Sequence, residues 1–144
     1  MPELYWSEPF SRHYVEELNA DESFRKNARK FEATLVLRCL DSPDGFDIEH
    51  TYRIARGVVS LDRWAEPSPH TALRQKPFDP SSALARTTAP YDIWMKLDRG
   101  EMNVLGAIRS PDYAVEGPKL KIMRALPVLN AMSACGARMN KRYA

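Results

Sequence analysis

The sequence predicts an α+β fold in which helices cover one face of a five-stranded, mostly antiparallel sheet. Two observations indicate this fold class. Between residues 31 and 64, apolar residues recur at every second position, which is the spacing of strands with one buried face. Near both ends of the chain they recur at every third or fourth position, which is typical of amphipathic helices. Because each kind of element has one apolar face, the two kinds are expected to pack together as layers.

Length and composition are those of a globular protein. The chain has 144 residues, of which 44% are hydrophobic and 28% charged, and it fits a single domain over residues 1–144. No apolar run is long enough to span a membrane, and the first residues lack the pattern of a secretory signal, so a cytoplasmic location is expected. Cys39 and Cys135 lie in apolar surroundings and are interpreted as reduced core residues. The net charge of +2 is too small for a general nucleic-acid-binding protein.

Two helices are expected at the start of the chain. Ser7 can cap the first of them, because its side chain can accept a hydrogen bond from a free backbone amide. The apolar stripe of this helix consists of Phe10, Tyr14 and Leu18, which are four residues apart. Asp21 can cap a second, shorter helix that follows directly.

Three strands are expected next. Residues 31–40 and 46–54 alternate between apolar and polar side chains, and the Ser-Pro-Asp-Gly turn at 42–45 joins them into a hairpin with one buried and one solvated face. Residues 56–64 make a third strand after a tight turn at Arg56-Gly57.

A proline-rich connection over residues 65–90 separates these strands from the rest of the chain. Its prolines block regular strands, so we expect a surface segment with one helical turn near Ser82–Arg86. Residues 91–98 alternate again and are predicted to form the fourth strand, with Trp94 on its solvated face. A short helix is expected near residues 99–108.

The last third of the chain is predicted to hold two helices and one strand. Ser110-Pro111-Asp112 has the pattern of a helix start, and Gly117 can end that helix. The alternation of Lys119–Met123 predicts the fifth strand. Pro127 can open the final helix, whose small residues and methionines favour loose docking, so that this helix is a candidate lid.

The polar residues offer little catalytic chemistry. His13, His50 and His70 share no spacing typical of metal ligands, and the aspartates between residues 41 and 47 fit a polar turn better than a calcium loop. The sequence also lacks a glycine-rich phosphate loop and a nucleophile elbow. We therefore expect no metal, no cofactor and no enzyme activity.

The order of these motifs resembles a known family. The letters NADESF precede a hairpin around SPDG, and YDIWMKLD leads later into GEMNVLGAIRSPDYAVEGPKLKIM. Over roughly residues 5–138, this arrangement is similar to the sterol carrier protein type 2 family of lipid-binding domains. The resemblance implies an apolar tunnel between the sheet and the helices that holds a fatty acid, an acyl-CoA or a sterol-like molecule. Peroxisomal members of that family end in a Ser-Lys-Leu-type signal, whereas this chain ends in Lys-Arg-Tyr-Ala.

The residues expected to face inward are the candidate tunnel lining, although the same residues would also suit an ordinary packed core. They are Leu35, Leu37, Ile48, His50, Tyr52, Ile93, Met95, Leu97, Met102, Leu105, Ile108, Tyr113, Leu120, Ile122, Leu129 and Met132. Within this set, His50 is either a polar anchor for a ligand headgroup or a histidine hydrogen-bonded in the core. Tyr52 and Tyr113 are amphipathic and suit the anchoring role equally.

Three functions are compatible with this sequence. The first is a carrier for a lipid-like, fatty acyl or other hydrophobic metabolite. The second is an accessory subunit that presents a hydrophobic intermediate to an enzyme, or binds a partner through the groove and the Trp94 face. The third is an enzyme that holds hydrophobic substrates near His50 or Tyr52.

Two further kinds of contact stay open from the sequence. The chain after Glu116 holds basic residues and no acid, which is compatible with a solvated surface or with weak attraction to an anionic membrane. Trp94, on the solvated face of its predicted strand, is covered either by the long connection over residues 65–90 or by a partner subunit in a homodimer or larger complex.

Overall fold

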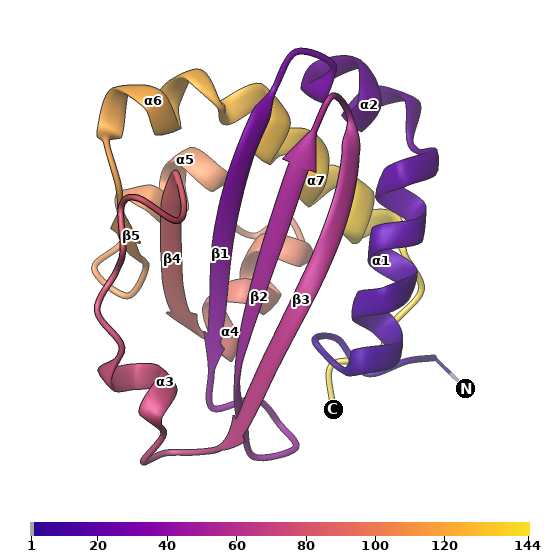
Figure 1. The fold of residues 1–144 in the computed structure, drawn as a ribbon. Coiled ribbons are helices and arrows are strands. Elements are labelled where there is room, and N and C mark those ends of the chain that lie inside the picture. Colours follow the sequence, from indigo (N-terminus) through magenta and orange to yellow (C-terminus); the bar gives the residue numbers. More distant parts are fainter. Residues whose placement is uncertain (1) are drawn as a thin grey trace.

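The computed structural model describes residues 2–144 (Figure 1). Its elements are α1 (Glu8–Ala20), α2 (Glu22–Ala28), β1 (Glu32–Leu40), β2 (Phe46–Ala55), β3 (Val58–Pro67), α3 (Ala72–Gln75), β4 (Ala85–Pro90), α4 (Tyr91–Asp98), α5 (Val104–Ile108), β5 (Ala114–Glu116), α6 (Lys119–Arg124) and α7 (Leu126–Arg138). The strands of this described range form one five-stranded sheet in the order β3-β2-β1-β4-β5. The β1–β4 pair is parallel, while β1–β2, β2–β3 and β4–β5 are antiparallel. The predicted α+β class and the mostly antiparallel sheet are thus confirmed.

The two opening helices begin where the sequence predicts. The Ser7 side chain accepts a hydrogen bond from the Phe10 amide at 3.4 Å, and Asp21 accepts one from the Phe24 amide at 3.1 Å. Phe10 and Leu18 are buried, so the apolar stripe of α1 faces the interior. Figure 1 shows α1, α2 and α7 together behind one face of the sheet.

The first three strands also follow the prediction. In the β1–β2 register Leu35 lies opposite Tyr52 and Leu37 opposite His50, so these side chains share the inner face. The β2–β3 turn places Arg56 and Gly57 at φ values of 53° and 79°, the left-handed backbone that tight hairpins require.

The prediction for the fourth strand was wrong. Residues 91–98 form the helix α4, and the strand is β4, within the segment expected to be a surface connection. Alternation over eight residues also allows a helical face, and Tyr91, Trp94 and Asp98 are all buried on α4. The helical turn expected near Ser82–Arg86 lies earlier, at α3.

The prediction for the fifth strand was wrong as well. Residues 119–124 form α6, and the strand β5 occupies part of the segment that had the pattern of a helix after Ser110. Gly117 follows β5 instead of ending a helix, and its φ is 135°. A Cβ atom at this glycine would lie 2.5 Å from the Leu84 carbonyl oxygen, so the close approach of the two backbones requires glycine. The helix expected near residues 99–108 is shorter and is α5.

The outer face of the sheet is less solvated than predicted. Arg38, Asp47 and Glu49 point to this face by strand alternation, yet each is at most 7% exposed. The connection between β3 and β4 covers them, since Thr71 and Arg74 both donate hydrogen bonds to the Asp47 carboxylate. The proline-rich segment is therefore a structural cover for the sheet.

The final helix begins as predicted, with Pro127 in the first turn of α7. The segment after α7 returns to the start of the chain, where the Arg142 carbonyl accepts a hydrogen bond from the Tyr5 amide at 2.9 Å (Figure 1). Cys39 and Cys135 are buried free thiols, as expected. Among the helices of residues 2–144, none is long and apolar enough to cross a membrane.

Candidate functional site

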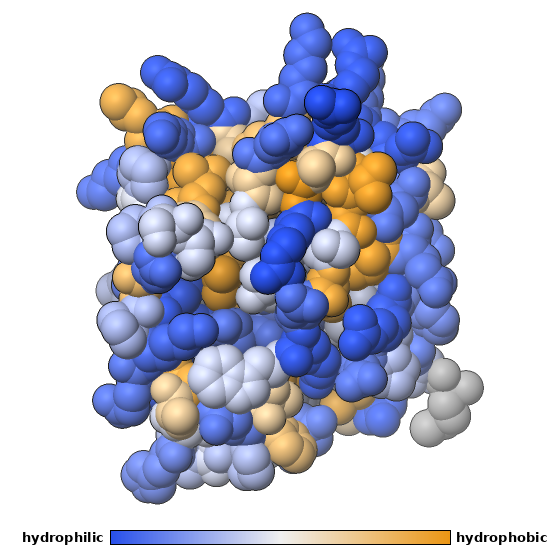
Figure 2. Space-filling view, in the orientation of Figure 1, coloured by the Kyte–Doolittle hydropathy of each residue, from blue (hydrophilic) through white to orange (hydrophobic). Residues whose placement is uncertain are grey.

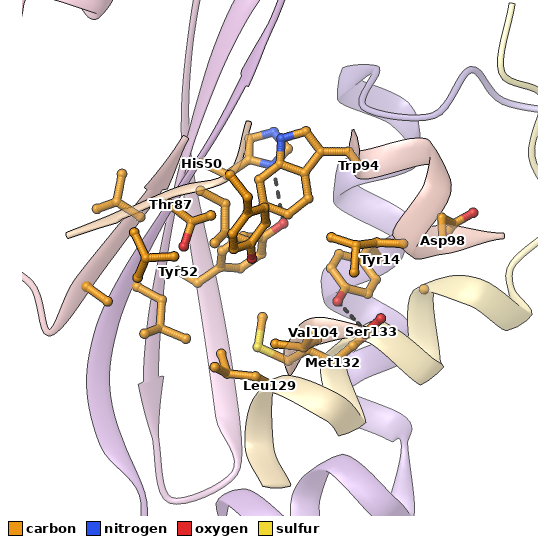
Figure 3. A pocket seen from close by; sticks show the side chains of 18 of the residues that line it. Tyr14, His50, Tyr52, Thr87, Trp94, Asp98, Val104, Leu129, Met132 and Ser133 are labelled. Atoms are coloured by element: carbon orange, nitrogen blue, oxygen red, sulfur yellow. Dashed lines mark hydrogen bonds between the residues drawn. The ribbon is translucent and has the colours of Figure 1, made fainter. Parts of the chain in front are cut away.

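A cavity of about 120 Å³ lies between the inner face of the sheet and the helices (Figure 3). Side chains from β1, β2 and β4 form one wall, and side chains from α1, α4 and α7 form the other. Most of the lining atoms are apolar. The predicted lining residues that the structure brings together here are Leu35, Leu37, His50, Tyr52, Leu97, Ile108, Tyr113, Ile122, Leu129 and Met132.

The remaining predicted residues lie elsewhere: Ile48, Ile93, Met95, Met102, Leu105 and Leu120 do not line the cavity. Ile48 and Ile93 pack in a separate part of the core around Trp6. Leu120 is 74% exposed, because α6 is a helix and turns only Ile122 into the interior. The two errors in strand assignment account for three of these six residues, Ile93, Met95 and Leu120.

The cavity contains aromatic residues that the prediction did not include. Trp6 stacks on His50 with ring centroids 4.5 Å apart, and its ring lies 5.3 Å from that of Trp94. Trp6 also adopts a φ of 69°, an uncommon backbone conformation for a residue other than glycine. The dense aromatic pattern of the first ten residues, with Tyr5-Trp6 and Phe10, was the available signal for this part of the site.

The expectation that Trp94 faces solvent was wrong. The Trp94 side chain is 6% exposed, and its indole nitrogen donates to the carbonyl oxygens of Arg38 and Ala89 at 3.0 and 3.1 Å. A partner cannot dock on a side chain that the fold itself encloses.

His50 is held by protein groups at both ring nitrogens. Arg63 Nη1 lies 2.9 Å from Nε2, and the Tyr52 hydroxyl lies 3.2 Å from Nδ1. Ser11 Oγ is 3.3 Å from Nε2 as well, but it donates its proton to the Ser7 carbonyl. His50 therefore has no free position for a ligand headgroup, and the hydrogen-bonded alternative of the sequence analysis is the one the structure shows.

Burial favours the neutral forms of His50, Tyr52 and Cys39. Burial, with repulsion from Arg63 and Arg12, holds the pKa of His50 well below its usual value. Burial also raises the pKa of the Tyr52 hydroxyl, so that it keeps its proton over the physiological range. The same cause raises the pKa of the Cys39 thiol, which is the opposite of what a cysteine nucleophile requires.

The cavity wall also contains one member of a buried ion pair between Asp98 and Lys141. Asp98 lines the cavity, and one of its carboxylate oxygens lies 2.5 Å from the Lys141 ammonium nitrogen. Lys141 also donates to the Gly136 carbonyl at 2.6 Å, and Tyr143 donates to Asp98 at 2.6 Å. Because these charges are paired, they present little net charge to the cavity.

This arrangement can hold an apolar molecule. Its polar groups are neutral or paired, and no group of three or more His, Cys, Asp or Glu side chains among residues 2–144 is placed to hold a metal ion. The volume of about 120 Å³ is close to the roughly 150 Å³ of a dry cavity that holds benzene. A long-chain guest needs a site of about 300 Å³ or more, so the cavity must widen to admit one.

Comparison with known proteins identifies the fold. No protein-family model and no curated protein matches the chain. A crystal structure of sterol carrier protein 2 matches with a TM-score of 0.73 and 16% identity, over 94% of this chain and 98% of that one. A solution structure from Thermus thermophilus, of a conserved hypothetical protein described as a possible sterol carrier protein, matches with a TM-score of 0.72 and 16% identity, over 96% and 92%.

A third structure, the solution structure of the sterol carrier protein domain 2 of Helicoverpa armigera, matches with a TM-score of 0.55 and 11% identity, over 93% of this chain and 91% of that one. The chain therefore has a fold like that of sterol carrier protein 2, as the resemblance in the sequence predicted.

Proposed function

We propose that this protein is a carrier for a lipid-like molecule, which it holds between the sheet and the helices without transforming it. The proposed ligand classes are fatty acids, acyl-CoA and sterol-like molecules, for which the cavity must widen. The observation that supports this proposal most is the largely apolar cavity between the sheet and the helices, and the likeness of the fold to sterol carrier protein 2 structures supports it as well. Because Trp94 is buried, nothing in the structure favours the alternative of an accessory subunit that docks through this residue.

The energetics favour a guest with a long apolar portion. Burial of ten methylene groups is worth about 8 kcal/mol at about 0.8 kcal/mol each. Association costs about 4–15 kcal/mol in lost freedom, so a short chain binds weakly. A long chain, or a chain with an additional hydrogen bond, is needed for useful affinity.

The cavity can widen most readily where α6 meets α7. The C-terminal half of α7 is held by hydrogen bonds from the Tyr14 hydroxyl to the Met132 carbonyl at 2.6 Å and from Arg138 to Asp21 at 2.9 Å. Neither α6 nor α7 has a side-chain hydrogen bond at its N-cap. We therefore expect the predicted lid to open from the α6 end.

Ligand loading is the test of this proposal. Protein purified from cells should carry a lipid adduct in native mass spectrometry, and the delipidated protein should bind a fluorescent long-chain fatty acid at one saturable site. Hexanoic acid should fail to displace the probe, because its short chain buries little area. Bound ligand should also slow amide hydrogen exchange in residues 126–139. Absence of both adduct and saturable binding would refute the carrier function.

The exposed face of α6 supports contact with an anionic membrane, where a carrier would take up its cargo. Leu120 and Met123 are 74% and 42% exposed, while Ile122 on the opposite side of the same helix lines the cavity. At the upper left of Figure 2, where Figure 1 places α6, apolar side chains lie at the surface among charged ones. The charged side chains of α6 are all basic: Lys119, Lys121 and Arg124.

Replacing both apolar residues should weaken this contact. The double variant Leu120→Asp/Met123→Asp removes the inserting side chains and opposes the basic residues, each of which is worth about 1 kcal/mol near an anionic surface. We expect at least about tenfold weaker co-sedimentation with phosphatidylserine-containing vesicles. Val58→Asp is the matched control, since Val58 is 57% exposed at the β2–β3 turn. Equal loss in both variants would contradict a specific role for α6.

A further inference from the structure

The cavity wall holds a hydroxyl group whose proton the fold leaves without an acceptor. The argument starts at Arg63, whose guanidinium can only donate hydrogen bonds. His50 Nε2 lies 2.9 Å from Arg63 Nη1 and must therefore accept. Because the imidazole is neutral, its single proton is on Nδ1 and is donated to the Tyr52 oxygen at 3.2 Å. Figure 3 draws this last bond at the sheet side of the cavity.

The proton of Tyr52 itself is then available to the cavity. Tyr52 is 2% exposed, and its hydroxyl has no acceptor among residues 2–144. Trp6 lines the same cavity, and its indole nitrogen is a second donor that is buried with no hydrogen-bond partner in the described chain. Trp6 stacks directly on His50, so both donors belong to one wall. A buried donor without an acceptor is unfavourable, and an oxygen atom of a bound molecule would satisfy it.

We propose that the Tyr52 hydroxyl binds an acceptor oxygen of the cargo, namely a carbonyl or carboxylate oxygen on an otherwise apolar chain. This inference rests on the proposed carrier function. The apolar remainder of the molecule packs against Leu129 and Met132, which lie across the cavity from His50 in Figure 3. The cargo is then held with its oxygenated end against the sheet.

The charges around the Arg63–His50–Tyr52 cluster favour a cargo molecule with a hydrogen-bond acceptor over one with a donor. The Arg63 cation donates to His50, which in turn donates to Tyr52. Because hydrogen bonds in such a chain polarise one another, the positive charge of Arg63 makes the Tyr52 hydroxyl a stronger donor. The acid that lines the cavity, Asp98, is paired with Lys141 and does not oppose an anionic ligand. An ammonium headgroup would meet donors only and should be rejected.

The test compares three molecules of equal chain length with the wild type and the Tyr52→Phe variant. Dodecanoic acid and methyl dodecanoate carry the acceptor oxygen, and dodecane does not. We expect the variant to bind the acid and the ester about tenfold more weakly, as the loss of one hydrogen bond predicts, and to bind dodecane unchanged. A larger loss for the acid than for the ester would identify a carboxylate as the preferred acceptor, and equal losses would identify a carbonyl.

Tyr113→Phe is the matched control, because Tyr113 also lines the cavity but does not belong to the Arg63–His50 cluster. This control should leave the preference for acid and ester over dodecane intact. If wild-type protein binds none of the three molecules, the carrier function fails. If Tyr52→Phe binds all three as the wild type does, the carrier function stands and the Tyr52 site is refuted.

The tautomer of His50 gives a readout that needs no variant. Nitrogen NMR shifts of the imidazole in the wild-type protein should report a neutral ring protonated at Nδ1. A ring protonated at Nε2 would leave the Tyr52 proton bound to His50, and would overturn the proposal even if Tyr52→Phe failed to fold.

Discussion

Thr87→Phe is expected to abolish the loading of long-chain ligands while preserving the fold. Thr87 lies in the middle of β4, between Leu37 of β1 and Val115 of β5, and its side chain lines the cavity (Figure 3). A phenyl ring at this position occupies most of the space that a guest needs, because the cavity measures only about 120 Å³. We expect affinity for a long-chain fatty acid to fall by about 100-fold or more, equivalent to about 2.7 kcal/mol.

The control for this variant is the same substitution on the other face of the sheet. Thr51 is partly exposed, and strand alternation places it opposite to the cavity-lining Tyr52. Thr51→Phe should bind the fluorescent fatty acid as the wild type does. Overpacking costs about 1–3 kcal/mol, so the thermal unfolding of both variants should be recorded with the binding. Undiminished binding by a folded Thr87→Phe would place the ligand outside this cavity.

The part of the fold that the sequence predicted is the part with long, regular patterns and specific turn chemistry. The strands β1, β2 and β3 extend over nine or ten residues each. Their alternation is therefore unambiguous, and Gly45 and Gly57 fix the turns between them. The caps at Ser7 and Asp21 have a direct chemical reason and were predicted equally well.

The short segments after residue 85 were not predictable by the same means. The strand β5 has three residues and β4 has six, ending at Pro90, so neither shows a clear period. The helices α4 and α6 have eight and six residues, over which helical and strand spacing overlap. Tertiary contacts determine whether these short segments become strands or helices. The strand β4, for example, lies between β1 and β5 and pairs with both of them.

The candidate site was predictable in its apolar part and not in its polar part. Residues such as Leu35, Tyr52 and Leu129 face inward from elements that were placed correctly. The cluster around His50 joins Trp6 to Arg63, which are far apart in the sequence. No spacing rule connects such residues, and only the folded chain brings them together.

Removal of the Asp47 carboxylate is expected to destabilise the fold by about 3 kcal/mol, which is a large effect for one side chain on the outer face of the sheet. Asp47 is fully buried and accepts hydrogen bonds from Arg74 Nε at 2.6 Å, the Thr71 hydroxyl at 2.7 Å and the Asp41 amide at 2.9 Å. Arg74 Nη2 donates a fourth hydrogen bond to Asp47 at 2.9 Å. Asp47→Ala would remove the acceptor of all four, and only Arg74 would keep another carboxylate partner, Asp41. The lower end of the usual range applies, because the Arg74 side chain is 28% exposed and water can replace part of its pairing. Urea unfolding at pH 7 measures this difference.

The same contacts determine how the contribution of Asp47 to the unfolding free energy changes with pH. Burial alone would raise the pKa of Asp47, but the hydrogen bonds from Arg74, Asp41 and Thr71 outweigh it, and the pKa is lowered. The stabilisation is therefore present above the unfolded pKa of about 4 and is lost as the pH falls through the lower folded value. The difference in unfolding free energy between wild type and Asp47→Ala should shrink between pH 5 and pH 2 or so.

Asp62→Ala is the control that separates burial from charge. Asp62 also pairs with an arginine, Arg53, but both side chains are more than half exposed. Such a surface pair is worth about 1 kcal/mol or less, so this variant should unfold close to the wild type at every pH. Because Asp47 lies on the face opposite the cavity, neither variant should change the affinity for a fatty acid while it is folded. Loss of binding in folded Asp47→Ala would instead show that the connection over the outer face controls the shape of the cavity.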